Sequence, residues 1–307
     1  MNVLVAILVS IIPVLVIIKL VYEMGEVKKQ PWIIILVLFL SGILSWILVR
    51  FISNLLGTNI YKSQMEVATL LGDNGFFLIS FGVISLIEEF FKFIIINIMC
   101  FKNKYFKNPY DAIMYAVCLS LGFAFIENIM YIINYGLSVA FSRALFSIPS
   151  HACFGIIMGY FLGMSKISKE NNLYNDSIAL RYSAFFFPFL FHGLYDFLLS
   201  LNNRIIYVIF IIFVFFMYGF SIYLIFRLYK LNSKNIKNRK ENVLFVRVKP
   251  QNKKNIYYDI LYNDNTNDLQ VENKNNNSLE TNWKKTELNE TVYENDKVDM
   301  KMFRNDD

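Results

Sequence analysis

Four groups of ionisable side chains stand out because they interrupt long apolar stretches. In chain order they are Glu88-Glu89 with Lys92, Glu127 with Asn128, His151, and His192 with Asp196. A charged side chain near the centre of a bilayer costs at least ~2.5–3.5 kcal/mol, so it is retained for a reason. The chain contains only 2 histidines, and both belong to this set. The set is therefore the candidate site.

Histidine and carboxylate ligands without cysteine suit Zn²⁺ at a catalytic site that keeps one position open for water. A carboxylate left over from metal binding can accept the proton of the metal-bound water. His192 and Asp196 are four residues apart and share a helix face, so they can form a proton relay or supply two metal ligands. The 3 cysteines lie far apart with no C-x-x-C spacing, which excludes a thiolate zinc site and a disulfide framework.

The sequence also predicts partners within the set. Glu88 and Lys92 stand at i, i+4 on one helix face and are expected to pair. Glu89 points about 100° away and is not expected to share that contact. Glu127 has no cation close to it in sequence, so its partner is expected to be a residue of another helix or a metal ion. Asp111 opens its helix, where a negative charge near the N-terminus is favourable, and is interpreted as structural.

Pro149 and Ser150 suit the start of a helix, which would place His151 in the first turn, facing inward. Glycines follow on the same helix at four-residue spacing: Gly155, Gly159 and Gly163. Small residues on one face let membrane helices approach closely, so this stripe predicts helix packing and no chemistry.

The helices that position these groups are visible as apolar blocks. Hydrophobic residues make up 56% of the 307 residues and charged residues 18%. Stretches of roughly 18 or more apolar residues indicate transmembrane helices. Such blocks occupy residues 3–22, 31–51, 75–101, 110–134, 149–166, 181–201 and 204–227. The predicted fold class is all-α, a polytopic membrane bundle of about seven transmembrane helices with a disordered polar C-terminal tail. Soluble Rossmann, barrel and sandwich folds are excluded.

Lysine and arginine gather in alternate loops, at residues 102–109, 166–181 and after residue 227. Loops rich in these residues stay in the cytoplasm. With seven spans, this places the N-terminus outside and the C-terminal tail in the cytoplasm of a multi-pass cell-membrane protein. Depths counted from the outer helix ends at ~1.5 Å per residue place the polar set in the outer half of the membrane.

The composition changes at about residue 231, after which Asn, Lys, Asp and Glu dominate. Such a segment cannot bury enough apolar surface to offset the entropy of ordering. The chain is therefore divided into a transmembrane domain, residues 1–228, and a polar, mostly disordered cytoplasmic tail, residues 229–307. Short strands are predicted within the tail at Val243–Val248 and Ile256–Tyr262.

Four motifs in order resemble those of the PrsW family of bacterial intramembrane proteases, relatives of the CAAX-processing and bacteriocin-processing membrane proteases. Glu88-Glu89-Phe90-Phe91-Lys92 is similar to the family's E-E-x-x-K motif, and Asp111 through Gly122-Phe123-Ala124 to Glu127-Asn128 is similar to its second motif. Arg143 with Pro149-Ser150-His151 is similar to the third motif, and His192-Gly193-Leu194-Tyr195-Asp196 to the fourth. The resemblance covers residues 75–200, which form the motif core.

The resemblance implies a glutamate-dependent and metal-dependent endopeptidase. Its substrate would be a single-span membrane protein, an anti-sigma factor that receives its first cut near the extracytoplasmic side, which leads to sigma-factor release in a stress response. The implied catalytic residues are Glu88, Glu89, Glu127 and His192. The implied metal ligands, for Zn²⁺, are Glu127, His151, His192 and Asp196. The expected partners are this substrate and the lipid bilayer, with no nucleic acid.

Two other classes of function fit parts of the pattern. Intramembrane Glu and His residues also build the relays of proton- or cation-coupled transporters. No internal repeat is visible, which weakens that alternative. A non-catalytic scaffold acting through its tail would leave the buried carboxylates unexplained. Chelator-sensitive cleavage by the purified protein distinguishes the protease from both.

Overall fold

The computed structural model describes residues 3–24, 31–55, 72–102, 106, 108–201, 203–241, 243–248, 258–263, 268–273 and 278–284. For residue 102 and for residues beyond 231, it describes the backbone alone. The chain divides into two compact units, Met1–Asn232 and Ser233–Asp307. The helices that carry the candidate site all lie in the first unit.

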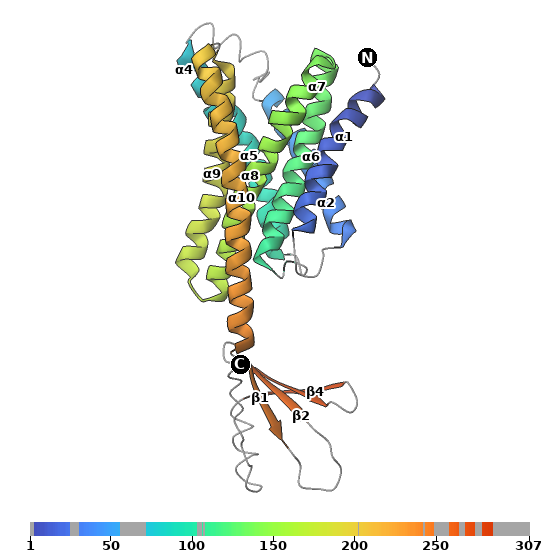
Figure 1. Ribbon diagram of the computed structural model, residues 1–307, viewed down its shortest axis with the longest axis vertical. Coiled ribbons are helices and arrows are strands. Elements are labelled where there is room, and N and C mark those ends of the chain that lie inside the picture. The colour runs from blue at the N-terminus through green and yellow to red at the C-terminus, as the bar shows by residue number, and fades with distance from the viewer. Residues whose placement is uncertain are drawn as a thin grey trace. The chain divides into compact units, whose positions relative to one another are not determined.

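Among the described residues, 6 helices are long and apolar enough to cross a membrane (Figure 1). They are α1 (Val3–Glu23), α2 (Trp32–Leu55), α6 (Pro109–Tyr135), a continuous helix over Ser138–Glu170, α9 (Tyr174–Ser200), and α10 (Arg204–Glu241) through Leu231. The continuous helix contains α7 (Ser138–Ser142), the π-helical segment η2 (Arg143–Ser147) and α8 (Ile148–Glu170). The predicted helical membrane bundle is therefore confirmed.

The predicted third span, residues 75–101, is also built from three helical segments. It is helical throughout, but it consists of α4 (Asp73–Ile79), the π-helical segment η1 (Ser80–Ser85) and α5 (Leu86–Lys102). Glu88, Glu89 and Lys92 all lie in the first two turns of α5. This span therefore carries three charged residues within two turns, directly after a π-helical segment.

Helix α6 lies at the centre of the bundle, packed between α8 on one side and α2 on the other. The glycine stripe of α8 allows this approach, as predicted. A Cβ on Gly155 would lie 2.9 Å from the Ala116 carbonyl oxygen, and one on Gly159 would lie 2.6 Å from the Ala112 carbonyl oxygen. Because real Cβ atoms do not come so close to backbone, only glycine fits here. The backbones of α6 and α8 are therefore held at close range, directly beside the candidate site.

The α-helix α8 begins at Ile148 with Pro149 in its first turn, close to the predicted start, but it continues a longer helical run. This run begins at Ser138 and passes through Pro149, because the π-helical segment η2 accommodates the proline. Proline has no N–H to donate to the carbonyl four residues earlier, which here belongs to Leu145. The Tyr218 hydroxyl donates to the Leu145 carbonyl oxygen at 2.7 Å instead. The Ile148 N–H donates to the carbonyl oxygen of Arg143, five residues earlier. His151 therefore lies deep within a long helix.

The second unit contains the end of α10 and four strands: β1 (Val243–Val248), β2 (Tyr258–Asn263), β3 (Asp268–Asn273) and β4 (Ser278–Lys284). They form an antiparallel sheet in the order β1-β2-β3-β4. The strand predicted at Val243–Val248 is confirmed, and β2 overlaps the one predicted at Ile256–Tyr262. The tail, residues 229–307, was predicted to be mostly disordered; its described residues instead form the end of α10 and these four strands, and its other residues lie outside the described part of the chain.

Candidate active site

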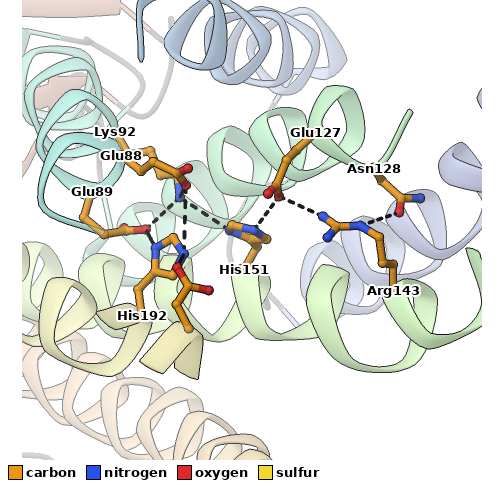
Figure 2. Close-up of polar contacts among 9 residues, drawn as sticks. Glu88, Glu89, Lys92, Glu127, Asn128, Arg143, His151 and His192 are labelled. Atoms are coloured by element: carbon orange, nitrogen blue, oxygen red, sulfur yellow. Dashed lines mark hydrogen bonds and ion pairs between the residues drawn. The ribbon is translucent and has the colours of Figure 1, made fainter. Parts of the chain in front are cut away.

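The structure gathers all six predicted site residues into one buried network (Figure 2). Helix α5 supplies Glu88 and Glu89, α6 supplies Glu127, α8 supplies His151, and α9 supplies His192 and Asp196. Two cations complete the network: Lys92, which the sequence predicted as a partner of Glu88, and Arg143, which was assigned no role in the site.

Lys92 is the fully buried cation of the network, with no exposed surface. Its Nζ lies 2.7 Å from Glu89 Oε1 and 3.9 Å from Glu88 Oε2. The predicted pairing of Glu88 with Lys92 is confirmed, but the prediction that Glu89 does not share this contact is wrong, because residues three apart on a helix are neighbours as well. The ammonium also lies 4.1 Å from the centroid of the Phe123 ring.

His192 is oriented by Glu89. Its Nδ1 lies 2.8 Å from Glu89 Oε1, so the Nδ1–H donates to this carboxylate. Its Nε2 lies 3.4 Å from Asp196 Oδ2 and 3.9 Å from Glu88 Oε2. The buried Glu88 Oε2 has no hydrogen-bond partner in the structure. Glu88 therefore keeps a carboxylate oxygen available beside an oriented imidazole.

Glu127 has its partners on the next helix, which is one of the two predicted alternatives, a residue of another helix or a metal ion. Its Oε2 lies 3.0 Å from Arg143 Nη2 and 3.0 Å from His151 Nε2. The other ring nitrogen of His151, Nδ1, lies 3.4 Å from Lys92 Nζ. Arg143 is in turn held by Asn128, whose Oδ1 accepts from Arg143 Nε at 2.9 Å. These contacts connect the two ends of the network through His151.

Asp111 lies outside the network and caps its helix, as predicted. Its Oδ2 accepts a hydrogen bond from the Asn108 backbone N–H at 2.8 Å, and the two residues form a capping box at the start of α6. Its role is structural.

A cavity of about 350 Å³ opens beside the network. Its polar wall consists of Glu88, Glu127, Arg143, His151, His192, Asp196 and several serines. Its apolar wall is mainly aromatic, with Phe76, Tyr131, Phe146, Phe154, Tyr195, Tyr207 and Phe210. Glu89 and Lys92 do not line it. The two adjacent glutamates thus differ in position, because Glu88 lines the cavity in which a substrate can bind and Glu89 does not.

The four predicted zinc ligands are not equally available for a metal ion. Glu127 Oε2 is shared between Arg143 and His151, and both nitrogens of His151 face other groups. His192 Nε2, Asp196 and the unpartnered oxygen of Glu88 have the donor chemistry that a divalent cation requires. As they stand, no three His, Cys, Asp or Glu side chains of the described chain form a complete metal-binding group. Among the predicted ligands, His192 and Asp196 therefore present donors toward the cavity, whereas Glu127 and His151 are engaged with other side chains.

Sequence reasoning missed Arg143 as a site residue although it lies in the third motif. Its distance from His151 in the sequence, eight residues, does not put the two on one face of a regular α-helix. The signal that could have found it is Pro149, because a proline inside a long helix disturbs the turn that precedes it.

Comparison with known proteins places the chain in a family. The family model described as PrsW family intramembrane metalloprotease matches residues 30–220. The chain is 38% identical over 191 residues to Protease PrsW of Oceanobacillus iheyensis, which covers 62% of this chain and 81% of that protein. It is 32% identical over 202 residues to Protease PrsW of Clostridioides difficile (64% and 80% covered) and 38% identical over 135 residues to that of Bacillus subtilis (44% and 60% covered). No solved structure matches the chain.

The matched region contains the whole network, from Glu88 to Asp196, and the helices that carry it. Membership in a protease family also favours the protease over the transporter and the scaffold. The chain belongs to the PrsW family of intramembrane proteases.

Proposed function

We propose that this protein is a glutamate-dependent endopeptidase that cuts a single-span membrane protein inside the cavity. The observation that carries this proposal is the position of Glu88. It lines the cavity, it has a carboxylate oxygen without a hydrogen-bond partner, and this oxygen lies 3.9 Å from His192 Nε2. A buried carboxylate beside an imidazole is suited to take a proton from an attacking water.

The two adjacent glutamates take different roles in this proposal. Glu88 removes the proton from water and returns it to the leaving amine. Glu89 is a positioning residue, since it orients His192 through Nδ1 and neutralises Lys92 without reaching the cavity. His192 presents Nε2 to the cavity, and because its hydrogen is on Nδ1, this bare nitrogen can bind a cation or accept a hydrogen bond.

We also propose that the reaction uses Zn²⁺, held on the cavity side by His192 and Asp196, which leaves Glu88 as the carboxylate that takes the proton. Four carboxylates of the network, Glu88, Glu89, Glu127 and Asp196, face two permanent cations, Lys92 and Arg143. With both histidines neutral and all four carboxylates ionised, the described network would carry an excess of two negative charges, which is costly in a buried site. A divalent ion would offset this excess, and bound zinc supplies Lewis acidity and a more acidic water.

The proposed substrate is a membrane-anchored regulatory protein of the anti-sigma-factor type, cut near its extracytoplasmic side as the first step toward sigma-factor release. The cavity wall includes residues at the ends of four helical segments that lie at one end of the bundle: Phe76, Ser142, Ser200 and Tyr207 (Figure 1). The distribution of positive loops supports an outward orientation of that end, with the N-terminus outside. The aromatic wall suits an apolar transmembrane segment.

The experiment that tests this function maps new N-termini in membranes of cells that express the full chain or its Glu88→Gln variant. The proposal predicts a new N-terminus in a single-span protein, at or outside its outer membrane boundary, that appears with the unmodified chain alone. If no N-terminus depends on Glu88, or if the dependent cut lies on the cytoplasmic side, the proposal is wrong.

A further inference from the structure

We infer that Arg143 is a positioning residue that acts through Glu127 to fix the tautomer and orientation of His151. The inference rests on the proposed function only in taking the cavity beside His151 as the place of reaction. Arg143 belongs to an unbroken series of polar contacts, most of which Figure 2 shows. The series comprises, in order, Ser10, Asn128, Arg143, Glu127, His151, Lys92, Glu89 and His192.

The π-helical segment brings Arg143 to the site. At about 100° per residue, an α-helix would place residues eight apart ~80° away from one another around the axis. A π-helical turn contains one extra residue, so the separation between Arg143 and His151 counts as seven, about two full turns. Both side chains then lie on one face. The Ile148 N–H, which donates to the Arg143 carbonyl five residues back, is the direct sign of this extra residue.

Arg143 is held firmly enough to position another group. Its Nε donates to Asn128 Oδ1 at 2.9 Å, and the Asn128 amide donates to Ser10 Oγ at 2.9 Å. Its guanidinium carbon lies 3.8 Å from the centroid of the Tyr131 ring. Its Nη2 forms an ion pair with Glu127 Oε2 at 3.0 Å. These contacts fix both the place and the ionised state of the Glu127 carboxylate, because the charged acceptor is the form that pairs with a guanidinium.

The partners of His151 then determine its tautomer. Glu127 Oε2, at 3.0 Å, accepts from Nε2, which must therefore bear hydrogen. The Lys92 ammonium, whose Nζ lies 3.4 Å from Nδ1, can only donate hydrogen bonds, so Nδ1 must be the nitrogen without a hydrogen. His192 has the opposite arrangement, since its Nδ1–H donates to Glu89. The two rings meet nearly edge to face, with centroids 5.3 Å apart and an angle of 80°, so the orientation of His151 also sets one wall around His192.

The chain offers a clean spectroscopic test, because His151 and His192 are its only histidines. Nitrogen NMR of the full-length protein labelled with ¹⁵N in histidine reads the four ring nitrogens directly. The structure predicts a protonated Nε2 and a bare Nδ1 for His151 in the unmodified chain. In Arg143→Gln the His151 Nε2 and Nδ1 signals should shift or lose their single-tautomer pattern. A matched control is Arg181→Gln, since Arg181 lies over the Phe101 ring and does not line the cavity.

The kinetic readout separates positioning from mere folding. In Arg143→Gln, kcat for a single-span reporter should fall by about 10- to 100-fold with little change in KM, as expected when an interaction that acts in the transition state is lost. Arg143→Lys should restore part of the kcat, because lysine keeps the charge but not the fork of donors that reaches both Asn128 and Glu127. Arg181→Gln should retain full kcat.

If Arg143→Gln does not fold, Asn128→Ala tests the same inference, since it removes one anchor of Arg143 and leaves Glu127 in place. It should shift the His151 signals in the same direction by a smaller amount. An unmodified chain with His151 protonated at Nδ1, or His151 signals that are unchanged in the variants, overturns the inference whatever the activity. Tautomer shifts in a protein that cleaves nothing would instead overturn the proposed function and leave this inference standing.

Discussion

Replacing Lys92 by methionine should destabilise the protein more than the loss of a single charge on the surface or in a loop. Lys92 is completely buried, and its ammonium lies 2.7 Å from the equally buried Glu89. Methionine keeps most of the volume of the lysine stem but removes the charge. The variant therefore leaves Glu89 as a buried carboxylate facing one neutral partner, His192.

The expected magnitude follows from this burial. Removing one partner of a buried ion pair costs about 3–5 kcal/mol, because the other charge remains uncompensated in a low-dielectric site. Pairs that keep contact with water are worth about 0–1 kcal/mol. The pair of Lys166 and Glu170, 3.1 Å apart and partly exposed, belongs to the second class and provides the matched control.

The assay is the free energy of unfolding in a mild detergent, measured for the unmodified chain, Lys92→Met, Lys166→Met and the double variant Lys92→Met/Glu89→Gln. The double variant should recover much of the loss, because it removes the unpaired charge along with its partner. If Lys92→Met costs no more than Lys166→Met, or if neutralising Glu89 recovers nothing, the account of Lys92 as the counter-ion of Glu89 is wrong.

Three further outcomes are expected. Purified protein should contain about one zinc ion per chain by elemental analysis. The variants His192→Ala and Asp196→Ala should lose this zinc, and Glu127→Gln should retain it. Equal zinc content in all four proteins would contradict the assigned ligands. Gly159→Val should unfold at a clearly lower temperature than the unmodified chain, since its side chain would collide with the Ala112 carbonyl; a matched change at Gly219, which has open space around it, should be mild. Deleting the residues after 241 should leave proteolysis of a reporter largely intact, because that segment is not part of the helices that carry the network; loss of activity in a deletion variant that still inserts would refute this.

The spans and the set of site residues could be predicted because both depend on local composition. An apolar block of membrane length has one stable form in lipid, so α1, α2, α6 and α9 follow from hydropathy. Charged residues inside such blocks are rare enough to be recognised individually. The glycine stripe of α8 was readable for the same reason, since small residues recur on one helix face.

The pairing of the site residues could not be predicted, because it depends on how helices face one another. The sequence places Glu88 and Glu89 side by side, but only the structure shows that Glu88 lines the cavity while Glu89 contacts Lys92 and His192. Arg143 was missed for a second reason. Its partnership with Glu127 depends on the extra residue of a π-helical segment, which helical spacing alone does not reveal.

The central claim is that the buried network around Glu88 performs proteolysis. The most direct test is cleavage of a single-span reporter by the purified full-length chain in detergent, compared with Glu88→Gln and with Glu170→Gln as a control of the same chemistry outside the network. We predict that the unmodified chain and Glu170→Gln cut the reporter at the same rate. Glu88→Gln should be slower by at least ~10²-fold, as expected for loss of a general base, while unfolding like the unmodified chain. Near-normal cleavage by a folded Glu88→Gln variant would contradict the account.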